Sequence, residues 1–196
     1  DPDPMAGFTA QYLNMWQLNI AKEEPGEPLT TPDLWDLLEA DLERDAPIVG
    51  AAIESWFGKG VTLGLAHKTT TGLHLTAHDF PTLAQAVEAL GTLDSRCKVK
   101  VGATLYDDPA VRVLGGRAEP AQGKAAAVAH DLGRHILEGT FTHSGDPYLS
   151  EQILKLRTKP APDGPRLVSK NRADAVKAVM WAFTIAHTRK ERRKRM

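Results

Sequence analysis

The hydrophobic pattern of the chain predicts an antiparallel meander followed by a crossover. Residues 48–53 form a short apolar run typical of a buried strand, and apolar residues alternate with small or polar ones in 61–65 and 73–77. Glycine-containing turns separate these segments, so we expect them to pair as antiparallel neighbours. Apolar residues at helical spacing predict a helix over 81–93, which leads to a fourth apolar strand at 99–105. A helix connecting two strands favours a parallel arrangement of the fourth strand with the first.

The rest of the chain predicts helices and two short extended segments. Alanine-rich residues 121–137 have a helical pattern, and 140–143 is expected to form a short fifth strand. Residues 149–156 and 171–187 have helical patterns, and 166–168 is expected to be extended. The order βββαβα, then a weaker strand and helices, predicts an α/β fold of the ribonuclease H-like class. Its mixed central sheet, a three-strand antiparallel meander plus parallel strands, is flanked by helices.

Composition limits the classes of function. Hydrophobic residues make up 42% and charged residues 25% of the 196 residues, which is typical of a globular domain. The formal net charge of -1 excludes a uniformly basic nucleic-acid binder. The single Cys97 excludes an internal disulfide, and there is no Cys/His pattern with zinc spacing. No run approaches the roughly 18 apolar residues of a membrane span, and no phosphate-binding glycine motif is present.

Three regions are expected from this pattern. Residues 1–45 are interpreted as an N-terminal linker segment, in which Thr31 precedes Pro32 as the cap of a short helix. Residues 46–188 are expected to be the folded domain, and 189–196 a basic tail. The first methionine is Met5, so we expect a fragment of a longer protein.

Carboxylates stand where this fold would bring them together. Ribonuclease H-like nucleases hold two divalent cations with acids from the first strand, the end of the fourth strand and a late helix. Glu54 follows the first strand, Asp107 and Asp108 lie beyond the fourth, and Asp174 lies in the first turn of the last helix. Carboxylate oxygens suit Mg²⁺ or Mn²⁺. The alternatives are a solvated turn residue for Glu54, a turn or helix cap for Asp107 and Asp108, and a favourable helix-terminus charge for Asp174.

Histidines and basic residues add weaker hypotheses. His67, His74 and His78 match no metal motif and are expected to be surface residues on strands. Lys170, Arg172 and Lys177 surround Asp174, and they either neutralise DNA phosphates or form a solvated face. The C-terminal run that contains Arg192 and Arg193 carries six basic residues and one acid, so it either binds phosphates or solubilises the terminus.

Several stretches, in order, resemble the C-terminal half of phage terminase large subunits. They are 8–16, 101–105, 139–149 and 172–182. The resemblance implies the nuclease domain that cuts concatemeric viral DNA during packaging, separated from its ATPase portion, in the cytoplasm of a bacterial host of a phage or prophage. It implies double-stranded DNA, the ATPase domain, the small subunit and the portal protein as partners, with no membrane.

The resemblance also assigns the ligands. Glu54 matches the first metal ligand of the family and Asp174 the last. The first ligand is usually aspartate, and the second usually ends the fourth strand, where this chain has Gly102 and Thr104. Asp107 or Asp108 would then reach in from the next turn.

Three hypotheses follow from these residues. The first is a DNA endonuclease that hydrolyses phosphodiesters with two metals, with Glu54, Asp108 and Asp174 as its catalytic acids. The second is a degenerate domain that binds DNA or docks on the portal, and the third is a recombination nuclease or integrase relative on the same fold. Cleavage requires Glu54 and Asp174 to meet in a pocket that no apolar or basic group fills.

Overall fold

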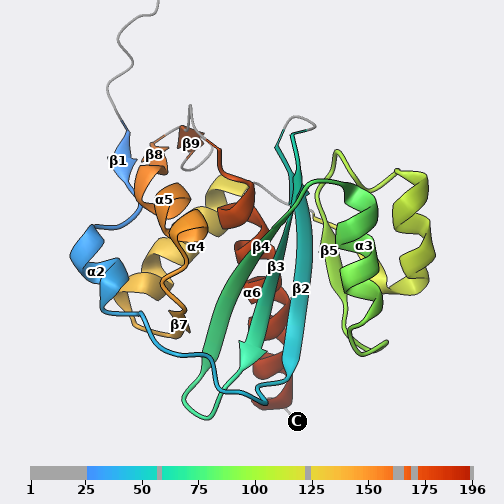
Figure 1. Ribbon diagram of the computed structural model, residues 1–196. Coiled ribbons are helices and arrows are strands. Elements are labelled where there is room, and N and C mark those ends of the chain that lie inside the picture. The colour runs from blue at the N-terminus through green and yellow to red at the C-terminus, as the bar shows by residue number, and fades with distance from the viewer. Residues whose placement is uncertain (1–25, 57–58, 122–124, 161–165, 169–171, 195–196) are drawn as a thin grey trace, which may run out of the picture.

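The computed structural model describes residues 26–56, 59–121, 125–160, 166–168 and 172–194, with the backbone alone for 125–130, 166–168 and 188–194. Its centre is a six-stranded mixed sheet in the order β6-β5-β2-β3-β4-β7 (Figure 1). These strands are β2 (Ile48–Ser55), β3 (Val61–Lys68), β4 (Leu73–Phe80), β5 (Val99–Val101), β6 (Ala118–Pro120) and β7 (Phe141–His143).

The meander and the crossover are confirmed. β3 pairs antiparallel with both β2 and β4, and β5 lies parallel to β2 after the helix α3 (Leu83–Gly91). β7 adds to the other edge, parallel to β4, as the short fifth strand that the sequence predicts. The sheet is therefore the mixed sheet of a ribonuclease H-like fold.

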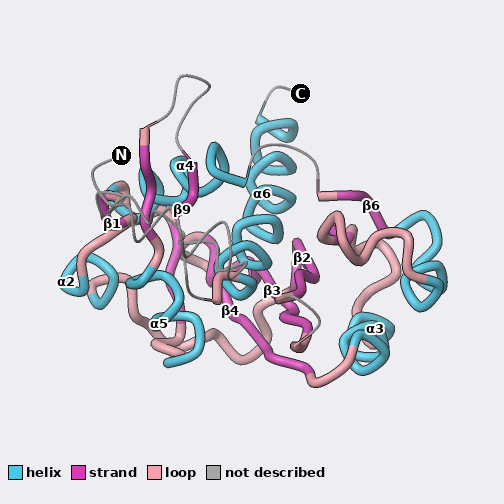
Figure 2. The backbone as a smooth tube through the Cα atoms, turned by 90° about the horizontal axis from the view of Figure 1, so that it is seen from above, coloured by secondary structure: helices cyan, strands magenta, loops and turns pink. Residues whose placement is uncertain are grey.

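Helices cover both faces of the sheet. α6 (Asp174–Lys194) runs along one face over β2 and β3, whereas α3 and the 3-10 helix η1 (Pro109–Arg117) pack on the opposite face (Figures 1 and 2). Successive strand residues face opposite sides, so Ala52 lies in the α6 core while Ala51 and Ile53 lie in the α3 core. Two more helices, α4 (Ala125–Leu137) and α5 (Pro147–Lys155), belong to the α6 side.

Small residues let α6 approach the sheet closely. Gly50, Ala52, Gly64 and Ala66 all face α6. A Cβ on Gly64 would lie 2.5 Å from the backbone nitrogen of Val179, a separation that real side chains do not adopt. The backbones of β2, β3 and α6 therefore pack with almost nothing between them, which fixes the position of the first turn of α6 relative to the ends of the strands.

A second, smaller sheet and the helix α2 (Pro32–Asp36) complete the described part. The strands β1 (Glu27–Pro28), β8 (Arg157–Lys159) and β9 (Arg166–Val168) form this sheet in the order β1-β8-β9. The Thr31 side chain caps α2, as the sequence predicts, by accepting from the Leu34 backbone N–H. Trp35 is 1% exposed, and its ring stacks on His143 of β7 with centroids 3.7 Å apart. Thus α2, within the expected 1–45 segment, packs into the core.

Some element boundaries differ from the predicted ones. The fourth strand, expected over 99–105, ends at Val101, because the Gly102 carbonyl accepts from the backbone N–H groups of Leu105 and Tyr106 and turns the chain. η1, β6, β1 and β8 were not predicted. The last helix begins at Asp174 and continues through Lys194. No helix in the described part of the chain combines the length and hydropathy needed to cross a membrane.

The expectation that His67 and His74 are surface residues is wrong. His74 is 0% exposed and His67 is 7% exposed, whereas His78 on the same strand as His74 is exposed. The His74 ring hydrogen-bonds the hydroxyls of Thr142 and Ser144, because β7 pairs with β4 and covers this position. Burial, with smaller contributions from His67 and His143, lowers the pKa of His74 to about 4.

This burial predicts a loss of stability in acid. The folded pKa of His74 lies below the unfolded value of about 6.5, so the unfolded chain binds the proton first as pH falls. Stability conferred by neutral His74 is complete above pH 6.5 and declines toward pH 4. We expect the wild type to lose about 1–3 kcal/mol over that range in urea denaturation, and His74→Gln to lose measurably less. His78→Gln should retain the wild-type dependence, and equal pH slopes for all three proteins would contradict this assignment.

Candidate active site

Three polar residues form a row across the meander on the face that α6 covers. Glu54 of β2 is opposite Thr62 of β3, and Thr62 is opposite Asp79 of β4. The same alternation that directs Ala52, Gly64 and Ala77 toward α6 directs this row toward the start of that helix. Asp79 is absent from the sequence-based candidates, although the pairing of the two predicted hairpins places it on the same face as Glu54.

Asp174 lies over the middle of this row and is completely buried. Its Oδ2 accepts hydrogen bonds from the Thr62 hydroxyl at 2.7 Å and the Tyr148 hydroxyl at 3.0 Å. The Arg172 guanidinium donates to both carboxylate oxygens, with Nε 3.0 Å from Oδ1 and Nη2 2.9 Å from Oδ2. Protein donors therefore satisfy the carboxylate of Asp174 from several sides.

Arg172 joins two of the acids. Its Nη2 lies 2.7 Å from Oδ1 of Asp79 as well as 2.9 Å from Oδ2 of Asp174. The guanidinium also lies over the Tyr148 ring, 5.1 Å from its centroid, and the Tyr148 hydroxyl oxygen lies 3.3 Å from Oδ1 of Asp79. Arg172, which the sequence proposes as a DNA contact, is thus held in an ion-paired network with Asp79 and Asp174.

The network keeps Asp174 ionised. Burial alone would raise its pKa, but hydrogen bonds from Arg172, Thr62 and Tyr148, together with the positive charge of Arg172, lower the pKa of Asp174 below its ordinary value. The same contacts raise the pKa of Arg172. Burial raises the pKa of the Tyr148 phenol, so Tyr148 stays a neutral donor at physiological pH. Asp174 and Arg172 are therefore a fully charged, hydrogen-bonded pair.

Glu54 lies in a different environment. It is 9% exposed, and the only hydrogen bond described for its carboxylate comes from the Ser55 backbone N–H at 3.1 Å. Burial raises the pKa of Glu54, and the negative charge of Asp174 adds to that rise, while Ser55 and the charge of Lys177 oppose it. Glu54 is paired with Thr62, whose hydroxyl donates to Asp174, so acids from distant parts of the sequence lie beside the same residue. Glu54 therefore retains lone pairs that no described protein group uses.

Gly102 provides the space for the Glu54 carboxylate. A Cβ on Gly102 would lie 2.7 Å from Cδ and 2.9 Å from Oε2 of Glu54. The Gly102 backbone N–H donates to the carbonyl of Ile53 at 2.9 Å, which holds the end of β5 beside the end of β2. The absence of a side chain after the fourth strand thus allows the longer glutamate to fold over that strand.

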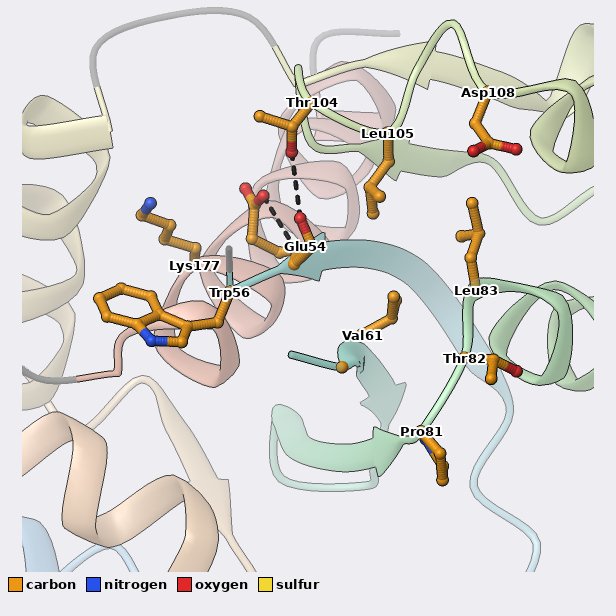
Figure 3. Close-up of a pocket in the computed structure, with 12 residues that line it drawn as sticks. Glu54, Trp56, Val61, Pro81, Thr82, Leu83, Thr104, Leu105, Asp108 and Lys177 are labelled. Carbon is orange, nitrogen blue, oxygen red and sulfur yellow. Dashed lines mark hydrogen bonds between the residues drawn. The ribbon is translucent and has the colours of Figure 1, made fainter. Parts of the chain in front are cut away.

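A cavity of about 480 Å³ opens beside Glu54. Its polar lining includes Glu54, Lys177 and Asp108, and much of the remaining wall is apolar (Figure 3). In Figure 3, Lys177 and Trp56 lie on one side of Glu54, and Asp108 lies on the far side of Leu105. The cavity thus combines one acid of the row with a cation and a second acid at its rim.

Asp107 and Asp108, the two acids that follow the fourth strand, line different cavities. The Asp108 carboxylate caps η1 by accepting from the Ala110 backbone N–H at 2.9 Å, in agreement with its alternative interpretation as a helix cap, and it also lines the cavity. Asp107 instead lines a separate hollow with Tyr106 and Arg112. The structure thus associates Asp108 with the cavity of Glu54 and separates Asp107 from it.

The basic candidates are only partly described. Lys177 lines the cavity on the first turns of α6 and Arg172 is ion-paired. Lys170 lies outside the described residues, as do the side chains of Arg192 and Arg193. Their proposed contacts with DNA stay predictions.

The described arrangement does not fit a divalent cation. The oxygen donors of Glu54, Asp79 and Asp174 are of the type that Mg²⁺ and Mn²⁺ prefer. However, Arg172 occupies Asp174 and Asp79 together, and no three His, Cys, Asp or Glu side chains within the described ranges are grouped to hold a metal ion. The donors are suitable in type, but a basic group fills the position between them.

The fold is similar to those of phage large terminases. The chain matches the HK97 bacteriophage large terminase with a TM-score of 0.64 and 11% identity, over 82% of this chain and 43% of that chain. It matches the large terminase nuclease of thermophilic phage G20c with bound magnesium with a TM-score of 0.57 and 12% identity, over 81% and 97%. The Thermus phage P74-26 large terminase nuclease domain gives a TM-score of 0.53 and 14% identity, over 74% and 82%.

These similarities confirm the expected fold and the resemblance to terminase nuclease domains. The chain spans under half of the HK97 terminase but nearly all of the G20c nuclease. No family model and no curated protein sequence matches it. At identities this low, the similarity shows a shared fold and leaves activity to be argued from the site.

Proposed function

We propose that this chain is the nuclease domain of a phage terminase large subunit and that it cuts double-stranded DNA. The observation that supports this function best is that Thr62, which pairs with Glu54 of the first strand of the meander, donates its hydroxyl to Asp174 in the first turn of the last helix. A ribonuclease H-like nuclease requires acids from these two places. The structural match, which covers 97% of the G20c nuclease, supports the same proposal.

The proposed residues have distinct roles. Glu54 and Asp174 would hold Mg²⁺ or Mn²⁺ once Asp174 is released by Arg172, with Asp108 approaching across the cavity; the bound ions would supply Lewis-acid activation for phosphodiester hydrolysis. Asp79 is a further candidate acid of the row. Lys177, on the cavity wall, is placed to attract a DNA phosphate to Glu54.

The wider assembly is part of the proposal. We place this domain downstream of an ATPase domain, with the small subunit and the portal protein as partners, acting on concatemeric viral DNA in the cytoplasm of the infected bacterium. The match to part of the HK97 large terminase supports the presence of a further domain in the complete protein.

A second function is favoured by one specific observation. The Arg172–Asp174 ion pair fills the position that a metal would need, as expected for a catalytically degenerate domain that binds DNA or docks on a portal. Under this alternative, the acids and Arg172 stabilise the fold, and Lys177 and the basic tail retain their contacts with DNA.

Plasmid nicking separates the two functions. The chain is incubated with supercoiled DNA and Mn²⁺, with and without EDTA, beside Glu54→Gln and Asp174→Asn. We expect metal-dependent nicking, and both substitutions should reduce it at least about 100-fold, because each removes a charged oxygen donor. Asp94→Asn is the matched control, because Asp94 is exposed and pairs with Arg96 away from the site. DNA binding without nicking at any Mn²⁺ concentration would support the degenerate domain.

A further inference from the structure

Arg172 supplies the positive charge of this site. Its guanidinium contacts the carboxylates of Asp79 and Asp174 and lies over Tyr148, while its side chain is 31% exposed. Arg172 precedes α6 by two residues, so its side chain is not part of the packed helix. The N–H edge of the guanidinium is therefore bound to the acids and the group lies over Tyr148, while part of the side chain remains accessible to solvent.

The hydrogen bonds of Asp174 leave little room for another cation. Oδ1 accepts from Nε of Arg172, and Oδ2 accepts from Nη2 of Arg172, Thr62 and Tyr148. A divalent cation binds carboxylate oxygens at roughly 2.0–2.6 Å and needs the same lone pairs. The guanidinium must therefore move before a divalent cation can bind Oδ2 of Asp174.

We propose that Arg172 is the resident cation of the site and that it competes with a divalent cation for Asp174. The inference rests on the proposed function for the class of ion. Asp79 contributes to this arrangement, because its carboxylate accepts from the same Nη2 that donates to Asp174 and so holds the guanidinium at Asp174. A divalent cation binds when Arg172 moves off Asp174, and the affinity for the ion is lowered by the free energy needed to break the ion pair.

The competition is tested by measuring Mn²⁺ binding, without DNA, to the full chain and to Arg172→Gln. Isothermal titration gives the affinity, and thermal unfolding in EDTA and in Mn²⁺ gives the stability. We expect Arg172→Gln to bind Mn²⁺ at least about tenfold more tightly than the wild type. The variant should also melt at a lower temperature than the wild type in EDTA, because Asp174 stays buried without its partner, and Mn²⁺ should restore much of that loss.

Three further variants make the result specific. Asp174→Asn combined with Arg172→Gln should abolish the gain in Mn²⁺ affinity, because it removes the contested carboxylate. Arg96→Gln, which removes an arginine paired with Asp94, should bind Mn²⁺ as the wild type does. Asp79→Asn keeps Arg172 and Asp174 but weakens the anchor, so it should bind Mn²⁺ several-fold more tightly, and it provides the test if Arg172→Gln does not fold.

Two outcomes would overturn the inference: unchanged Mn²⁺ affinity in Arg172→Gln and Asp79→Asn, or a gain that survives in the double variant. The proposed function fails separately. Tight, Asp174-dependent Mn²⁺ binding by Arg172→Gln without nicking by any variant would reject the nuclease and support the competition. Nicking by the wild type, with no change in Mn²⁺ affinity when Arg172 is replaced, would support the nuclease and reject the competition.

Discussion

Replacing Gly64 with alanine is expected to destabilise the domain by about 3 kcal/mol or more, although it adds a single methyl group. The added Cβ would lie 2.5 Å from the backbone nitrogen of Val179 and 2.6 Å from the carbonyl oxygen of Ala178. Backbone atoms in a helix cannot move individually, so α6 would have to shift off β3. Urea denaturation, monitored by tryptophan fluorescence and by circular dichroism, measures this loss.

Gly91 is the matched control for this substitution. It ends α3, and a Cβ there would meet nothing within 4 Å. Gly91→Ala should leave the free energy of unfolding unchanged or raise it by up to about 1 kcal/mol, because alanine is the better helix former. Equal stability of the two variants would show that α6 does not approach the sheet as closely as described.

Trp35→Ala should have an effect of similar size at the other side of the domain. Trp35 is buried, stacks on His143, and contacts Phe141 edge-on with ring centroids 6.3 Å apart. Its indole N–H also donates to Ser150 at 2.9 Å. Removal of a buried tryptophan costs about 3–5 kcal/mol. The free energy of unfolding from urea denaturation is the measurement, and a single transition should be retained.

Leu37, two residues later, is the control for Trp35. It is 79% exposed, so Leu37→Ala should change stability by less than about 0.5 kcal/mol. If Trp35→Ala were as mild as Leu37→Ala, α2 would be a peripheral attachment, and the expected start of the domain at residue 46 would hold. A large effect of Trp35→Ala alone would move the start of the folded unit upstream of α2.

The strands of the meander could be predicted because local pattern and tertiary environment agree in them. Apolar alternation in 61–65 and 73–77 specifies strands, and short glycine turns leave few ways to pair them. Topology also brings the start of the last helix over the end of the first strand, which places Asp174 beside Thr62, the partner of Glu54. These inferences need only the order of the elements.

The predictions that failed concern residues whose environment depends on contacts between segments distant in the sequence. His67 and His74 resemble solvated strand residues in the sequence, but the pairing of β7 with β4 buries His74. The fourth strand ends early because Gly102 accepts hydrogen bonds from two later residues. The very short strands β1 and β8 carry too few residues to show a period.

The ion pairs of Arg172 were not expected from the sequence for a related reason. Its sequence neighbours mark it as one of three cations near Asp174, and nothing local distinguishes an ion-pair partner from a phosphate ligand. Asp79, the second carboxylate that holds Arg172 in the ion pair, is 93 residues away from Arg172 in the sequence. The row Glu54, Thr62 and Asp79 could have been found by extending the two hairpins in register, because alternate residues on paired strands stay on one face.

The close contact of Gly50 and Gly64 with α6 determines which group can move when the ion pair at Asp174 breaks. Gly50 and Gly64 lie directly against the backbone of α6, so the helix that carries Asp174 cannot move relative to the sheet. Arg172 precedes the helix, so its side chain can move off Asp174 without any shift of α6. Exchange of the guanidinium for a metal ion would then need a rotation of one side chain and no movement of α6, and side-chain rotations are faster than domain motions.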